Sequence, residues 1–184
     1  MISNTSPDNS MSDKVVYLMR GLPSSGKSHL ARRLVGDVGV LLETDQFFYR
    51  DNGDGTQSFH YSEAQLPAAR QWVFEKFREA LAEARSPIVL DRGNGLNAET
   101  RRFAQYAVDQ GYRVELKEPD SPWWQEIKEL MRGRPSTNPL LDQWALRLSQ
   151  MSLETHRVPL DTIQKWLSTW RVDLTVEEIL GQVR

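Results

Sequence analysis

The chain of 184 residues contains no cysteine, which excludes disulfide bonds and every zinc site built on thiolates. The three histidines, His29, His60 and His156, lie too far apart in the sequence to show the spacing of metal ligands. No apolar run approaches the roughly 18 residues of a membrane helix, so no membrane partner is expected. The N-terminus also lacks the basic start and apolar core of a signal peptide, and we expect a cytoplasmic protein.

The sequence also lacks a strong excess of charge of either sign. The formal net charge is -2 and the sequence pI is about 6.0, whereas proteins that bind nucleic acid usually have a basic balance. A polynucleotide would therefore have to meet a local basic patch. The length fits one domain with a full core, and we expect a disordered tail over residues 1–13 and a single domain over residues 14–184.

Short apolar segments alternate with amphipathic ones through the first two thirds of the chain. The pattern predicts strands at residues 15–19, 39–43, 87–91 and 112–116, and helices at 28–36, 62–84, 98–110, 123–131, 141–153 and 160–170. Such alternation predicts an α/β fold with a parallel sheet covered by helices in three layers. The helical last third, roughly residues 120–170, is expected to form a lid.

Residues 21–28 read GLPSSGKS and match the phosphate-binding pattern G-x-x-x-x-G-K-S. The loop follows an apolar strand and precedes a helix, so backbone N–H groups and the helix N-terminus would surround the phosphates of a nucleoside triphosphate such as ATP. Lys27 is expected to bridge the β- and γ-phosphates, and Ser28 to present its hydroxyl to Mg²⁺. The predicted nucleotide-binding residues are Gly21, Ser24, Ser25, Gly26, Lys27, Ser28 and His29, although His29 would fit a helix surface equally well.

Two acidic residues stand at the carboxyl ends of predicted strands, where ligands of open parallel sheets bind. Asp91 ends an apolar run and is expected to hold Mg²⁺, whereas Asp45 is a candidate general base for an attacking hydroxyl. A strand-end aspartate is also typical of a turn or a helix cap. The aromatic run at residues 47–49 could stack on an acceptor base but fits core packing better.

Several segments of the chain resemble the P-loop polynucleotide-kinase-like family. They are residues 16–28 (VYLMRGLPSSGKS), 44–48 (TDQFF) and 91–94 (DRGN), with further similarity at 111–114 (GYRV), 118–123 (EPDSPW) and 156–161 (HRVPLD). The family includes the kinase domain of the phage 5′-polynucleotide kinase and its animal relatives. The resemblance covers most of residues 15–170.

The resemblance implies an ATP-dependent phosphotransferase that moves a γ-phosphate to a hydroxyl. Asp45 matches the general base of the family, while Asp91 and Asn94 match positions beside the phosphates or the acceptor. Arg50 matches an arginine that contacts the acceptor phosphate. Gly93 departs from the family, which has a hydroxyl residue there.

The lid arginines also depart from the family pattern, because Ser152 and Leu153 stand where relatives carry an arginine pair. An apparent insertion supplies other arginines that could stabilise the transferred phosphoryl group. The candidates are Arg132 and Arg134, with Arg147 and Arg157 as alternatives.

Three functions remain open at this point. The first is phosphorylation of a polynucleotide 5′-OH, as the resemblance suggests. The second is a nucleoside or other small-molecule kinase, which the acidic pI favours. The third, of a different class, is a nucleotide-binding switch module without phosphotransfer.

Overall fold

The structure is a computed structural model that describes residues 13–93, 95–133, 138–155 and 157–182. Three residues singled out above, Asn94, Arg134 and His156, lie outside the described residues, as does nearly all of the expected N-terminal tail.

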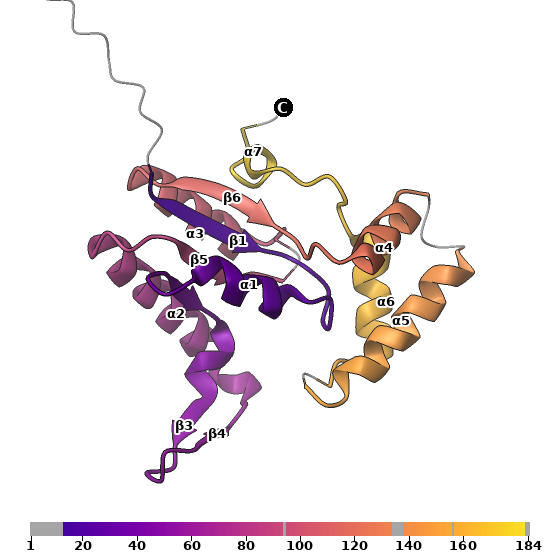
Figure 1. Cartoon of the computed structure of the whole chain (residues 1–184), viewed down its shortest axis with the longest axis horizontal. Coiled ribbons are helices and arrows are strands. Elements are labelled where there is room, and N and C mark those ends of the chain that lie inside the picture. The colour runs from indigo at the N-terminus through magenta and orange to yellow at the C-terminus, as the bar shows by residue number, and fades with distance from the viewer. Residues whose placement is uncertain (1–12, 94, 134–137, 156, 183–184) are drawn as a thin grey trace, which may run out of the picture.

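A four-stranded parallel sheet forms the centre of the fold (Figure 1). Its strands are β1 (Val15–Met19), β2 (Val40–Leu42), β5 (Ile88–Asp91) and β6 (Arg113–Lys117), in the order β2-β5-β1-β6. Met19 pairs in register with Asp91 on one side and with Lys117 on the other. The carboxyl ends of these three strands therefore meet at one edge of the sheet.

Helices cover both faces of the sheet, which confirms the predicted α/β class. Helix α1 (Lys27–Val35) lies on one face, and α2 (Leu66–Ala82) and α3 (Ala98–Asp109) lie on the other (Figure 1). Strand β1 shows why: Val16 and Leu18 point into the cluster with α2 and α3, while Met19 faces α1. A strand buried on both faces does not alternate between apolar and polar residues, and β1 shows no such alternation.

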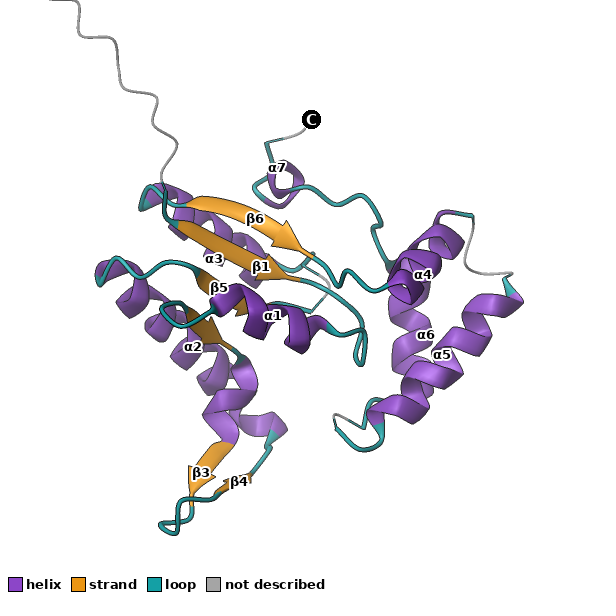
Figure 2. Ribbon diagram, viewed as in Figure 1, coloured by secondary structure: helices purple, strands orange, loops and turns teal. Residues whose placement is uncertain are grey.

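The last third of the chain forms a separate group of helices beside the sheet (Figure 2). We call α4 (Pro122–Arg132), α5 (Pro139–Ser152) and α6 (Leu160–Thr169) the helical unit. Its three helices share an apolar cluster that includes Trp124, Ile127, Leu148 and Ile163, all fully buried. Among the described residues, no helix has the length and apolar content needed to cross a membrane.

A small hairpin was not predicted from the sequence. After a 3₁₀ helix, η1 (Thr44–Phe48), the strands β3 (Tyr49–Asp51) and β4 (Gln57–Phe59) pair antiparallel and project away from the sheet (Figure 1). Residues 52–56 connect the two strands at the tip of this hairpin. Each strand has three residues, too few to give an alternating pattern.

Two further elements differ from the prediction. The long helix expected from residue 62 is preceded by a 3₁₀ turn, η2 (Glu63–Gln65), because Pro67 has no N–H to donate and so marks the first turn of α2. A short C-terminal helix, α7 (Val176–Ile179), was not predicted, although the reciprocal cap between Thr175 and Glu178 marks its start.

Candidate nucleotide-binding site

The phosphate-binding loop leaves β1 at the edge of the sheet and leads into α1. The Gly21 N–H donates to the Gly93 carbonyl at 3.0 Å, and the Ser25 N–H donates to the Leu22 carbonyl at 3.1 Å. Gly26 has φ 90°, a left-handed conformation that side chains rarely adopt, and a Cβ there would meet nothing within 4 Å. The turn into α1 therefore needs glycine and faces open space, which suits a bound phosphate.

The chemistry around the loop also fits an anion. Helix α1 has no acidic residue in its first turn, so its N-terminal dipole is not offset there. Within the described part of the chain, the buried Ser25 hydroxyl has no hydrogen-bond partner, and a phosphate oxygen would supply one. Ser28 lies in the first turn of α1 and is partly buried, whereas His29 is exposed on the same helix.

Lys27 and Asp91 form an ion pair at the mouth of the loop. The Lys27 Nζ lies 2.9 Å from Asp91 Oδ1, and the two side chains keep 15% and 20% of their surface exposed. The same Nζ lies 3.4 Å from the Gly21 carbonyl oxygen, so the lysine folds back over its own loop. Lys27 and Asp91, which were predicted from separate motifs, are therefore in contact and partly exposed to solvent.

Asp45 and Glu43 follow β2, the strand that pairs with β5. Asp45 lies in the first turn of η1 and is partly buried. Glu43 caps η1: its side chain accepts from the Gln46 N–H, and the Gln46 side chain accepts from the Glu43 N–H. Burial raises the pKa of Glu43, and the nearby carboxylates of Asp91 and Asp45 raise it further. Three carboxylates thus share this edge of the sheet.

Glu43 was missed by the sequence analysis. The strand end reads Glu43-Thr44-Asp45, with two acids two residues apart. Only Asp45 was singled out, because Glu43 was counted as the last residue of the predicted strand 39–43. The spacing of Glu43 and Asp45 could have revealed both, since a strand end can direct two such side chains at one site.

Among the described residues, no group of three or more His, Asp or Glu side chains could hold a metal ion. In nucleotide sites Mg²⁺ commonly takes one or two protein ligands together with phosphate oxygens and waters. Ser28 and Asp91, the predicted metal residues, carry the hydroxyl and carboxylate oxygens that such a site needs.

We expect Glu43→Gln to stabilise the nucleotide-free protein. The glutamine oxygen can still cap η1, while the charge that Asp91 and Asp45 repel is removed. Because the pKa of Glu43 is raised in the folded protein, the ionised side chain destabilises the folded state. This destabilisation is complete above the folded pKa and disappears below the unfolded pKa of 4.5. The melting temperature at pH 7.5 should rise by about 1–3 °C, since solvent screens part of the repulsion.

The measurement is thermal unfolding of both proteins between pH 4 and pH 8 in EDTA. The gain should shrink steadily as the pH falls and be absent at pH 4. A gain that is equal at every pH would show that the charge of Glu43 is not its cause. Glu63→Gln, an exposed glutamate in η2, is the control.

The predicted acceptor residue Arg50 lies on the hairpin. Its Nη1 donates to the carbonyl oxygens of Phe47 at 2.6 Å and Tyr49 at 3.1 Å, and its guanidinium lies 5.7 Å from the Phe47 ring centre. The exposed arginine is therefore held near the base of the hairpin. Asp91, also predicted to contact the acceptor, pairs with Lys27 as described above, and Asn94, the third predicted acceptor residue, lies outside the described residues.

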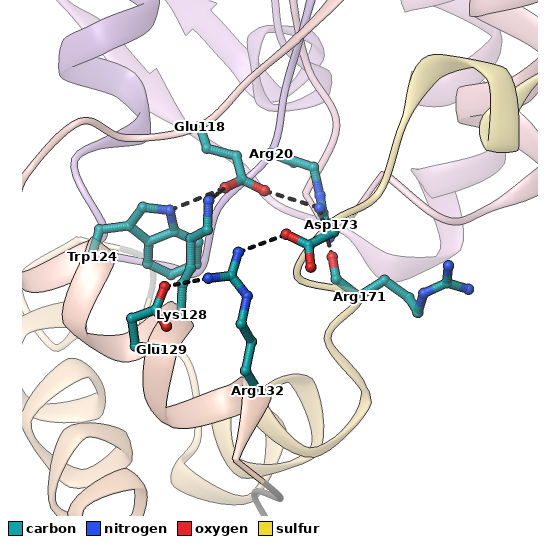
Figure 3. A network of polar contacts seen from close by, with 8 residues as sticks. All are labelled: Arg20, Glu118, Trp124, Lys128, Glu129, Arg132, Arg171 and Asp173. Carbon is teal, nitrogen blue, oxygen red and sulfur yellow. Dashed lines mark hydrogen bonds and ion pairs between the residues drawn. The ribbon is translucent and has the colours of Figure 1, made fainter.

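The candidate lid arginines are held in different ways. Arg132, at the end of α4, pairs with Glu129 and lies 2.6 Å from Asp173 Oδ1 (Figure 3). Arg134 lies outside the described residues. The guanidinium of Arg147 lies over the Trp144 ring at 5.0 Å, and Arg157 has φ 49° in the segment after α5. The contacts found for Arg132 are with carboxylates, not with the phosphate-binding loop.

Comparison with known proteins gives a family for this arrangement. A family model described as an AAA domain matches residues 16–165. Human NEDD4-binding protein 2 is 38% identical over 120 residues, which is 64% of this chain and 6% of that protein. Human YLP motif-containing protein 1 is 27% identical over 159 residues, 72% of this chain and 7% of that protein. The chain thus spans less than a tenth of the length of these curated relatives.

Proposed function

We propose that this chain, which belongs to the AAA-domain family, is an ATP-dependent kinase. The reaction would move the γ-phosphate of ATP to a hydroxyl, and a polynucleotide 5′-OH is the first candidate acceptor. The observation that carries the proposal is the ion pair of Lys27 with Asp91 at the mouth of the loop, 2.9 Å long. Asp45 lies in η1, just after the neighbouring strand β2.

Each of these side chains has a role that follows from its chemistry. Lys27 leaves Asp91 and donates to the β- and γ-phosphate oxygens, where it offsets negative charge that develops during transfer. Mg²⁺, when bound, adds positive charge beside the same phosphates. Ser28 and Asp91 would hold it. Asp45 accepts the proton of the acceptor hydroxyl as the oxygen attacks phosphorus.

The helical unit would serve as the lid in this reaction. An arginine from it would approach the transferred phosphoryl group, with Arg132 and Arg134 as the first candidates. Arg132 would first have to leave Glu129 and Asp173, both of them exposed partners, and exposed ion pairs are weak enough to exchange for a phosphate.

The hairpin offers an acceptor surface next to the proposed base. Tyr49, Phe59 and Tyr61 are 47%, 48% and 56% exposed. The rings of Phe59 and Tyr61 contact the buried Phe48 ring, one edge-on and one tilted. η1, which carries Asp45, leads directly into this hairpin. Exposed rings favour an acceptor that carries a base, because every base can stack on an aromatic face.

Charge on the hairpin favours a small acceptor as the second candidate. Asp51 and Asp54 lie in or beside the hairpin turn, and Glu63 follows it, against the single arginine Arg50. Phosphates of a long strand would be repelled by these carboxylates. A nucleoside has the base without the phosphates.

We expect Tyr61→Ala to raise KM for a base-bearing acceptor and to leave kcat nearly unchanged. Base–aromatic stacking contributes about 1–3 kcal/mol per base, so KM should rise roughly five- to 150-fold. Leu146→Ala, which removes a 49% exposed side chain on α5, is the matched control. Equal KM values in both variants and the wild type would remove the hairpin from acceptor binding.

The proposed function is tested by transfer of labelled γ-phosphate from ATP with Mg²⁺. The acceptors are 5′-OH DNA and RNA oligonucleotides and a panel of nucleosides. Label on oligonucleotide ends supports the first acceptor, and label only on nucleosides supports the second. ATP binding without transfer to any acceptor would contradict the kinase and leave a nucleotide-binding switch module as the better account.

A further inference from the structure

Arg20 joins the phosphate-binding loop to the helical unit. It precedes Gly21 directly, and its side chain is 1% exposed. The Nη1 donates to Glu118 Oε1 at 2.9 Å and to the Arg171 carbonyl at 2.8 Å (Figure 3). The guanidinium lies 4.2 Å from the Trp170 ring centre. The side chain thus reaches both the segment that enters α4 and the segment that leaves α6.

Glu118 extends the same network into α4. Its Oε2 accepts from the Lys128 ammonium at 2.7 Å and from the Trp124 indole N–H at 3.4 Å (Figure 3). Burial lowers the pKa of Arg20 and the Glu118 carboxylate acts against that shift. Buried ion pairs of this kind often contribute little net stability, and in some proteins they fix one arrangement of the chain.

The next two residues of the loop also contact this part of the molecule. A Cβ on Gly21 would lie 3.2 Å from Pro119 Cδ, so the connecting segment packs closely on the loop backbone. Leu22 is fully buried in the apolar cluster of the helical unit, and the other buried members of that cluster lie between Trp124 and Trp170. Leu22 therefore inserts the phosphate-binding loop into the core of the helical unit.

We propose that Arg20 and Leu22 are positioning residues that make the phosphate-binding loop and the helical unit one cooperative body. Arg20 contacts the segments that enter and leave the helical unit, and Gly21 packs against the entering segment. Leu22 lies in the apolar core of the unit itself. The loop then keeps its phosphate-binding shape only while α4, α5 and α6 are in place. By reciprocity, a ligand that orders the loop also stabilises the helical unit.

Native-state hydrogen exchange of the nucleotide-free protein tests this coupling. Ile163→Val removes one methylene group from a fully buried site in α6, and Ile88→Val removes the same group from a fully buried site in β5. Loss of one methylene should speed the opening of its own unit roughly two- to tenfold. The amides of Gly21 and Ser25, which donate to Gly93 and Leu22, report on the loop.

Ile163→Val should speed exchange at the loop amides by the same factor as at the α6 amides. Ile88→Val should leave both sets unchanged while it lowers the stability of the sheet core. Loop amides that keep the wild-type rate in Ile163→Val, while α6 amides exchange faster, would overturn the proposal.

Nucleotide binding gives a second readout, and this one rests on the proposed function. ATP with Mg²⁺ should slow exchange in α6 of the wild type and of Ile163→Val, because a nucleotide that binds only the ordered loop also holds α6 closed. Exchange in α6 that ATP leaves unchanged, although ATP is bound, would contradict the coupling. The ATP affinity of Ile163→Val should stay close to that of the wild type, because the closed arrangement remains the main population. Ile88→Val should bind ATP as the wild type does. A protein that binds no nucleotide would contradict the proposed function, and the exchange experiment would still decide the coupling.

Discussion

Lys27→Ala should lower kcat for phosphate transfer by about 10²–10³-fold, the cost of removing one donor that stabilises transition-state charge. Two effects act together. The substitution removes the cation beside the γ-phosphate, and it leaves Asp91 without the partner that lies 2.9 Å away. The unpaired carboxylate then faces the phosphates and repels them, so nucleotide affinity should fall as well.

Steady-state transfer and direct ATP binding measure the two effects separately. Lys27→Ala combined with Asp91→Asn should recover part of the affinity for ATP measured in EDTA, because the repulsion is gone. The double variant should not recover kcat, because the cation and the proposed Mg²⁺ ligand are both missing. Lys76→Ala, which removes an exposed lysine paired with Glu79 on α2, is the control. Unchanged kcat in Lys27→Ala would contradict the assignment of residues 21–28 as a working phosphate-binding loop.

Asp45→Asn should lower kcat by about 10²–10⁴-fold and leave ATP affinity unchanged, because the asparagine has similar shape and cannot accept the proton. Asp45 lies in η1, which follows β2, the strand that pairs with the strand carrying Asp91, and not on the phosphate-binding loop. A split between catalysis and binding is therefore the expected signature. Lys27→Ala should change both quantities.

Single-turnover transfer and ATP titration measure this split, and Asp37→Asn, an exposed acid after α1, is the control. A parallel fall in kcat and ATP affinity would indicate a role in nucleotide binding and not in proton transfer. Full activity in Asp45→Asn would point to Glu43 as the base, since that carboxylate shares the same edge of the sheet.

The sheet and the loop could be predicted because their signals are local. Residues 21–28 combine a fixed glycine spacing with a preceding apolar strand, and the two requirements exclude most chance matches. Asp91 was placed correctly at a strand end, which the register with Met19 confirms. The strand order β2-β5-β1-β6 was not predicted, since it depends on packing between segments far apart in the chain.

The contacts of Arg20 and Leu22 could not be foreseen for the same reason. In the sequence both look like ordinary positions around a glycine, and their partners lie about a hundred residues away or more. The hairpin was missed although Asn52-Gly53 and Asp54-Gly55 are typical turn pairs. Its strands were too short, at three residues each, to show which side chains share a face.

The helical unit also concentrates the tryptophans of the chain. Five of the six tryptophans lie in it or at its end, and only Trp72, in α2, belongs to the sheet side. Trp124 contacts Glu118, and Trp170 lies under Arg20, so two indoles adjoin the residues that reach the loop. Intrinsic tryptophan emission should therefore report on the helical unit nearly alone. An ATP titration monitored by tryptophan fluorescence would report binding at the loop without an added label.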